Sequence, residues 1–228
     1  MLKLLAIIAM VIDHIGILFT NDNYWFRFIG RIAFPLFAGL LAYNYFFRTS
    51  NQRKFFHRLI IFAFISQSFY MFAFQTVRLN IFFQFVFTIW TFNALNKFII
   101  QNNVKNFVQF FIVFTISFFL SIYTSYQGFG FLIVFTLFIY FYSYKNNFYN
   151  SLLFKFLLIF LLLVLLVWLN PIKYWPSAIV NLLLVIYLPS IEQWKKEYFK
   201  QINKKYRYLF YWFYPIHIFL LKLFQIFL

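Results

Sequence analysis

Asp13 and His14 stand side by side inside an apolar stretch that begins at Leu2. Ionisable side chains at such a depth in a hydrophobic segment are costly, so they usually face a bundle interior or a water-filled cavity. The whole chain has only four Asp and Glu residues and three His residues. Because an imidazole has a pKa of about 6.5, it is suited to proton transfer at neutral pH. His14 is therefore a candidate for proton-transfer chemistry.

Other polar side chains are expected at a similar depth in the apolar segments that follow. At about 1.5 Å per helical residue, Asp13 lies just past the middle of the first segment. We expect Arg31, in the second segment, to pair with Asp13, and we interpret Arg27 as an interfacial anchor whose side chain reaches the headgroups. The further candidates for this layer are Ser66, Gln67, Asn80, Tyr214 and His217.

Each of these groups also has a purely structural interpretation. Asp13 and Arg31 can form an ion pair that only joins two helices, and Ser66, Gln67 and Asn80 can hydrogen-bond to neighbouring helices. The second histidine of the layer follows a proline and can fill the backbone defect that this proline leaves.

Neighbouring residues on a helix point about 100° apart, so we expect no direct bond between Asp13 and His14. We expect His14 to face a hydrated cavity that it shares with His217. Gly16 and Gly30 are expected to let the first two helices approach closely.

These side chains must be positioned by a bundle of membrane-spanning helices. The chain of 228 residues is 64% hydrophobic and 11% charged, whereas a soluble domain has about 25% charged residues. We predict an all-α, polytopic transmembrane bundle with a single domain over residues 1–228 and about nine spanning helices, within a range of eight to ten. The predicted segments are 2–20, 27–47, 55–76, 80–100, 107–122, 129–144, 148–169, 174–190 and 208–228.

The sequence indicates two of the breaks between segments with different clarity. The break at 170–176 is firm because it contains two prolines, whereas the split at 123–129 relies only on polar residues and glycine. The first segment is interpreted as a retained transmembrane helix, because Asp13 and His14 interrupt it and no signal-peptide cleavage pattern follows.

The net charge of +16 is explained by membrane topology. Fifteen of the 20 Lys and Arg residues fall on one side of the predicted bundle, and the positive-inside rule makes that side cytoplasmic. We therefore expect a multi-pass protein of the inner (cytoplasmic) membrane, surrounded by lipid, with its N-terminus inside, its C-terminus outside and no nucleic-acid partner. The absence of cysteine excludes disulfide and thiol chemistry.

Five stretches of the sequence resemble the TraX family of membrane proteins from conjugation systems. They are LKLLAIIAMVIDHIG (2–16), RFIGRIAFPLFAGLLA (27–42), RLIIFAFISQ (58–67), LNIFF (79–83) and YPIHI (214–218). The resemblance covers residues 2–90 densely and 208–220 thinly. The positions that match family motifs are Asp13, His14, Gly30, Arg31, Pro35, Ser66, Gln67, Asn80 and His217.

The resemblance implies a membrane acyltransferase that uses acetyl-CoA as the donor. TraX proteins are linked to N-terminal acetylation of pilin, and related membrane enzymes acetylate sugar hydroxyls, so a protein or a glycan is the implied acceptor. On this interpretation His14 or His217 is the base, Asp13 and Arg31 complete the catalytic set, and Ser66, Gln67, Asn80 and Tyr214 contact the substrate. Arg48, Arg53, Lys54 and Arg58 are predicted to hold the phosphates of CoA.

Three alternatives remain open at the level of sequence. Proton-coupled transporters also bury Asp, His and Arg, although the chain shows neither an inverted repeat nor paired broken helices. A noncatalytic assembly factor of the cell envelope would carry the same helices. A zinc site made by Asp13, His14 and His217 is disfavoured, because no His pair has the i, i+4 spacing, and we predict no metal.

Overall fold

The computed structural model describes residues 2–20, 23–146, 152–191 and 207–228, and within these ranges it is helical throughout with no β-strand. The elements are α1 (Leu2–Phe19), α2 (Tyr24–Gly30), α3 (Ala33–Phe47), α4 (Gln52–Phe74), α5 (Ile81–Gln101), α6 (Val104–Ser121), α7 (Gln127–Asn146), α8 (Leu152–Leu169), the 3-10 turn η1 (Ile172–Tyr174), α9 (Trp175–Ile186) and α11 (Arg207–Phe227). The predicted all-α bundle is confirmed, and so is the weaker boundary between the fifth and sixth segments.

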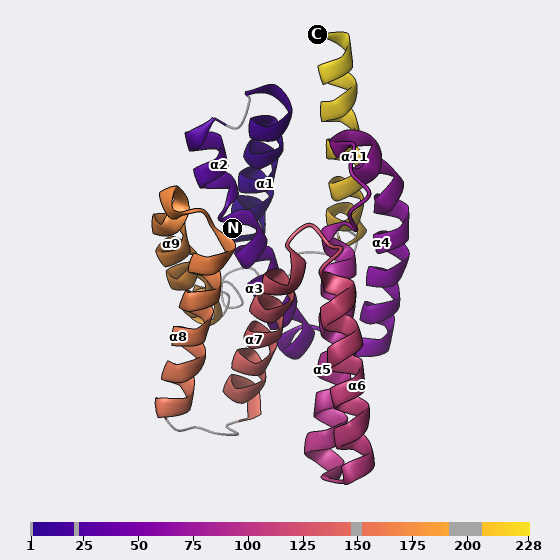
Figure 1. Ribbon diagram of the computed structural model, residues 1–228, viewed down its shortest axis with the longest axis vertical. Helices are drawn as coiled ribbons and strands as arrows, with labels where there is room; N and C mark the ends of the chain where they lie inside the picture. The colour runs from indigo at the N-terminus through magenta and orange to yellow at the C-terminus, as the bar shows by residue number, and fades with distance from the viewer. Residues whose placement is uncertain (1, 21–22, 147–151, 192–206) are drawn as a thin grey trace.

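Successive long helices run in alternating directions (Figure 1). Among the described residues, six segments are long and apolar enough to cross a membrane, and two shorter apolar helices accompany them. Together with α5, which segments of membrane-spanning length flank on both sides, they make an integral membrane bundle of about nine spans within the described residues. The connections 75–80, 122–126 and 170–174 lie toward one end, which we call the pocket end, and 48–51 and 102–103 lie toward the other end.

The second predicted segment is interrupted, because α2 ends at Gly30 and α3 begins at Ala33. Pro35 has no backbone N–H, so the carbonyl of Arg31 loses the partner that it would have in a continuous helix. The side-chain amide of Asn181 on α9 supplies a replacement, since its Nδ2 donates to the Arg31 carbonyl at 3.0 Å. The break therefore turns the chain immediately beside the predicted site and anchors it to α9.

Helix α11 packs against α1 and α4, which carries its histidine to the first helix. Gln225 Nε2 donates to the carbonyl of Leu18 at 2.5 Å and joins α11 to the end of α1. Residues 217 and 14 are thus brought together although 203 positions separate them in the chain.

Candidate functional site

Helices α1 and α2 approach closely at two glycines, as the sequence predicts. A Cβ atom built on Gly16 would lie 2.7 Å from Cβ of Phe26, and a Cβ atom on Gly30 would fall on the carboxyl group of Asp13. Both positions therefore exclude any larger residue without movement. Gly30 occupies the part of α2 that faces Asp13, and this fixes which arginine can reach the carboxylate.

The partner of Asp13 is Arg27, and the expected pairing with Arg31 is wrong. Arg27 Nη1 lies 2.6 Å from Asp13 Oδ1, and the two side chains are only 15% and 14% exposed. Arg27 precedes Gly30 by three residues and so lies on the same face of the helix as Gly30. Arg31 follows Gly30 directly and is turned about 100° from it around the helix axis. The interfacial-anchor interpretation of Arg27 is corrected by the same contact. The i, i+3 spacing of Arg27 and Gly30 is the sequence signal that indicates this pairing.

His14 and His217 form a hydrogen-bonded pair between α1 and α11. His14 Nδ1 lies 2.9 Å from His217 Nε2, and the rings are nearly parallel with centroids 5.0 Å apart. His217 Nδ1 lies 2.7 Å from the carbonyl oxygen of Phe213, to which it must donate. Neutral His217 therefore accepts at Nε2, so His14 donates from Nδ1 and carries its free lone pair on Nε2.

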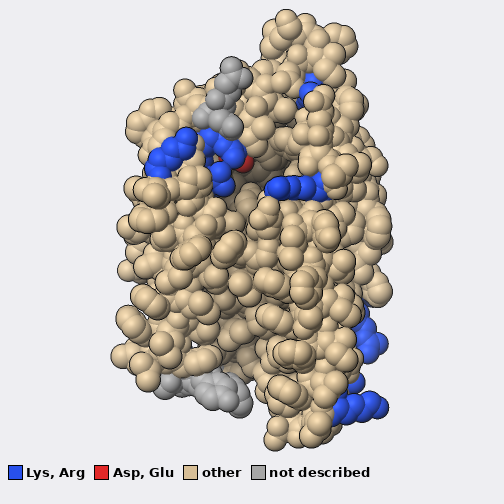
Figure 2. Space-filling view, in the orientation of Figure 1, with Lys and Arg blue, Asp and Glu red and all other residues tan. Residues whose placement is uncertain are grey.

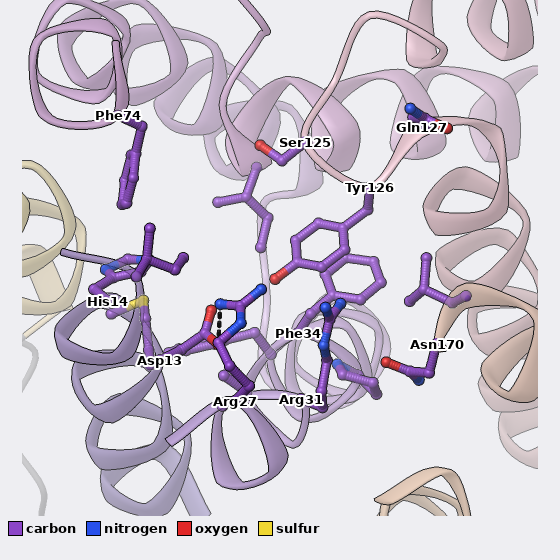
Figure 3. Close-up of a pocket in the computed structure, with 18 of the residues that line it drawn as sticks. Asp13, His14, Arg27, Arg31, Phe34, Phe74, Ser125, Tyr126, Gln127 and Asn170 are labelled. Atoms are coloured by element: carbon purple, nitrogen blue, oxygen red, sulfur yellow. Dashed lines mark hydrogen bonds and ion pairs between the residues drawn. The ribbon is translucent and has the colours of Figure 1, made fainter. Parts of the chain in front are cut away.

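His14 lines a pocket of about 430 Å³, together with Asp13, Arg27, Arg31 and residues from α3, α4, α7 and α8. Figure 2 shows the pocket as a hollow in the upper part of the drawn face, with basic side chains on either side and acidic surface inside. Figure 3 shows His14, the Asp13–Arg27 pair and Arg31 in sequence across it. His217 is buried behind His14 and does not line the pocket.

The far wall of the pocket comes from a part of the chain in which the sequence shows only apolar helices and turns. Ser125, Tyr126 and Gln127 line it, as do Trp168 and Asn170. These residues sit at the ends of α6, α7 and α8. One feature of the sequence indicates these residues. The polar turns at 123–127 and 170–173 lie at the same end of the bundle as the contact between α1 and α2.

Hydrogen bonds between two turns hold this wall in place. The amide of Leu79 donates to the carbonyl of Tyr123 at 2.8 Å, and the amide of Ser125 donates to the carbonyl of Leu79 at 3.0 Å. The ring of Tyr126 stacks on Phe34 with centroids 3.8 Å apart. Burial raises the pKa of the Tyr126 phenol, so its hydroxyl stays protonated and can donate a hydrogen bond into the pocket.

Three of the predicted substrate contacts do not line the pocket. Asn80 caps α5, and its Nδ2 donates to the carbonyl of Ala63 and to Gln67 Oε1 at 2.8 and 3.0 Å. Gln67 Nε2 donates in turn to the carbonyl of Arg78, and Ser66 is fully buried on α4. Gln67 and Asn80 thus hold α4 to the start of α5, and a substrate-binding role gains no support from these positions. Tyr214, the fourth predicted contact, does line the pocket.

The residues predicted to hold CoA lie at the other end of the bundle. Arg48 ends α3, and Arg53, Lys54 and Arg58 lie in the first two turns of α4. Along α4, Arg53 and Lys54 precede Phe74 at the pocket by about 20 residues and Arg58 precedes it by 16, which corresponds to roughly 24 to 32 Å at 1.5 Å per residue. None of the four lines the pocket.

No cluster of three or more His, Cys, Asp or Glu side chains occurs in the part of the chain that the structure describes. The two histidines instead bond to each other and to a backbone carbonyl. Such an arrangement can hold an imidazole in one tautomer with a nitrogen ready to accept a proton.

Replacing Gly30 by Ala is expected to displace Asp13 and to destabilise the protein by about 2 kcal/mol through overpacking. Gly39→Ala is the matched control, because its added Cβ would meet only the side-chain ends of Leu188 and Val185 at 3.3 Å. Thermal unfolding of the two variants in detergent measures the difference. Equal midpoints for both would show that α1 and α2 are not in close contact at Gly30.

Comparison with known proteins agrees with the resemblance seen in the sequence. A family model described as TraX protein matches residues 1–225. A probable fimbrial assembly protein FimC, serogroup H1, of Dichelobacter nodosus is 42% identical over 82 residues, which are 33% of this chain and 33% of that protein. The uncharacterized protein RP591 of Rickettsia prowazekii (strain Madrid E) is 40% identical over 67 residues, which are 29% of this chain and 25% of that protein.

The matches thus span a third or less of the length of these two relatives. No solved structure matches the chain.

Proposed function

The chain belongs to the TraX family, and from that premise we propose that it is an integral-membrane acyltransferase. It would move an acetyl group from acetyl-CoA to an amine or hydroxyl of an acceptor, such as a pilin N-terminus or an envelope glycan. The observation that carries this proposal is the chain of hydrogen bonds from the Phe213 carbonyl through His217 to His14 at the pocket wall.

In the proposed reaction, His14 Nε2 removes the proton from the acceptor amine or hydroxyl as that group attacks the thioester carbonyl carbon. The tetrahedral intermediate collapses by breaking the carbon–sulfur bond, and the proton passes from His14 to the departing thiolate. His217 holds the imidazole of His14 in the required tautomer and accepts a hydrogen bond from the imidazolium that forms.

The oxyanion of the intermediate needs donors that are already in place. Arg27 lines the pocket beside Asp13, and a guanidinium carries five N–H donors. The Tyr126 hydroxyl is directed toward the same pair (Figure 3). We propose that Arg27 and Tyr126 stabilise the oxyanion and that Asp13 positions Arg27.

For the donor, the family resemblance implies acetyl-CoA. The positive-inside rule favours an N-terminus on the cytoplasmic side of the inner membrane. In this orientation the pocket end faces away from the cytoplasm, and Arg48, Arg53, Lys54 and Arg58 face the cytoplasmic pool of CoA. A nucleotide held by them would have to pass its pantetheine arm through the bundle toward His14.

Mass spectrometry of envelope proteins and glycans from cells with and without the gene tests the proposal. We expect a pilin peptide or a glycan to be heavier by one acetyl group when the gene is present. Purified protein incubated with radiolabelled acetyl-CoA and envelope material from the deletion strain should transfer the label to the same molecule. An unchanged envelope together with no transfer in vitro would overturn the assignment.

A noncatalytic role in envelope assembly is a second candidate, since one relative is named as a probable fimbrial assembly protein. The two candidates differ in their dependence on His14. A scaffold should retain its function in a His14→Gln variant that still inserts, whereas an acyltransferase should not.

A further inference from the structure

We propose that Arg31 and Arg78 form an anion site in the pocket, which binds a phosphate or carboxylate group of the acceptor. This inference rests on the proposed function, because it describes one part of the acceptor. The inference adds that the acceptor has an anionic group at some distance from the amine or hydroxyl that reacts.

The first argument is the excess of positive charge in the pocket. Among the described residues, three arginines line it, namely Arg27, Arg31 and Arg78, against one carboxylate, that of Asp13. Asp13 is paired with Arg27, and no ion pair of Arg31 or Arg78 occurs within the described residues. Two guanidinium groups of the pocket thus have no carboxylate partner in the part of the chain that the structure describes, and a bound anion would balance them.

The second argument is how Arg31 is held. Its guanidinium carbon lies 5.4 Å from the centroid of the Tyr174 ring, and its backbone carbonyl is held by Asn181. Contact with an aromatic ring occupies the face of the guanidinium and leaves its N–H groups free to donate in the plane. Its Nε is buried and has no hydrogen-bond partner in the described structure. A desolvated donor of this kind favours an anionic acceptor atom.

The third argument is an unused acceptor on the same side of the pocket. Asn170 donates from Nδ2 to the carbonyl of Leu166 at 2.8 Å, but its Oδ1 is buried and has no partner among the described residues. Figure 3 draws Asn170 on the Arg31 side of the pocket, away from His14. A ligand that places an anionic group on Arg31 and an O–H or N–H group on Asn170 would satisfy both buried atoms.

Arg78 provides a second cation at the rim. It is exposed, and its backbone belongs to the turn that Gln67 and Leu79 fix in place. An exposed cation at a pocket mouth raises the local concentration of anions and speeds their entry. Arg31 would therefore supply most of the affinity and Arg78 most of the salt-sensitive association rate.

The placement of the anion assigns it to the acceptor. Across the pocket, the Asp13–Arg27 pair lies between His14 and Arg31 (Figure 3). An acceptor held by its anion at Arg31 can thus present an amine or hydroxyl to His14 across the oxyanion donors. The cations predicted for CoA lie at the other end of the bundle, so the two substrates would use separate anion sites.

Binding of inorganic pyrophosphate to the purified full-length protein tests the proposal without any need for turnover. Equilibrium dialysis at constant ionic strength should show in the wild type a site that depends on Arg31, in addition to any binding at the cations predicted to hold CoA. Arg31→Gln should weaken binding at least about tenfold, because a hydrogen bond to a charged group is lost, and Arg31→Lys should be intermediate. Arg78→Gln should weaken binding less and reduce its dependence on salt.

Arg58→Gln is the matched comparison, since Arg58 also has a buried Nε without a partner and lies over an aromatic ring, that of Phe55, but at the other end of the bundle. Loss of pyrophosphate binding in Arg58→Gln and not in Arg31→Gln would overturn the site. Competition between CoA and pyrophosphate that is removed by Arg31→Gln would assign the anion to the donor and overturn the proposal. Intact binding at Arg31 without any acetyl transfer would contradict only the proposed function.

Discussion

A His14→Gln variant is expected to insert and fold but to transfer acetyl groups at least about 100-fold more slowly than the wild type. General bases contribute roughly 10²- to 10⁴-fold to such reactions, and glutamine keeps a polar side chain beside His217 without a basic nitrogen. The loss should appear in the rate of transfer from saturating acetyl-CoA, with binding of CoA unchanged. Single-turnover transfer of radiolabelled acetyl to envelope acceptor measures it directly.

His57→Gln is the matched control, because His57 is an exposed histidine on α4 and lies outside the pocket. It should transfer at the wild-type rate. His217→Gln should lose less activity than His14→Gln, since His14 would keep its position at the pocket wall. A larger loss in His217→Gln would make His217 the base, and full activity in His14→Gln would exclude the proton-transfer mechanism.

Asp13→Asn is expected to lower the free energy of unfolding by about 3 kcal/mol. Removing one member of a buried ion pair is strongly destabilising, because the other charge stays desolvated and loses that partner, and the side chain of Arg27 is only 15% exposed. Asn retains the shape of Asp, so the loss reports on charge and not on packing. Equilibrium unfolding of purified protein in mixed detergent micelles provides the measurement.

The choice of partner is tested by double variants. Adding Arg27→Gln to Asp13→Asn should restore much of the lost stability, because the unpaired charge is then removed. Adding Arg31→Gln instead should restore none. If Arg31→Gln restored the stability of Asp13→Asn and Arg27→Gln did not, Arg31 would be the partner of Asp13. That result would contradict the geometry of α1 and α2.

The order of spans and the depth of the polar groups could be predicted from the sequence, because both depend on counting residues along single helices. The apolar segments predicted an all-α bundle of about nine spans, and the structure agrees. Asp13, His14 and Tyr214 were predicted to lie at one depth in the bundle, and all three line the pocket. His217 was expected to share the cavity of His14, but it does not line the pocket. The close approach at Gly16 and Gly30 also followed from residue size alone.

The choice between Arg27 and Arg31 could not be made from depth alone. Both arginines lie at the same end of the second segment, and the rotation of α2 about its axis decides which one meets Asp13. That rotation is set by Gly30 against α1 and by the break before Pro35, which Asn181 stabilises from α9. Gln67 and Asn80 likewise share the depth of the site but are turned toward each other.

The sequence by itself determined that this protein is a membrane helix bundle of the TraX type, with a histidine and an aspartate at depth in its first span. The tertiary structure alone decided that Arg27 holds Asp13, that His217 holds His14, and that Tyr126 and Asn170 close the pocket. The physical reason is that hydropathy and residue counts describe each helix separately. The faces that helices present to one another depend on packing between segments far apart in the chain.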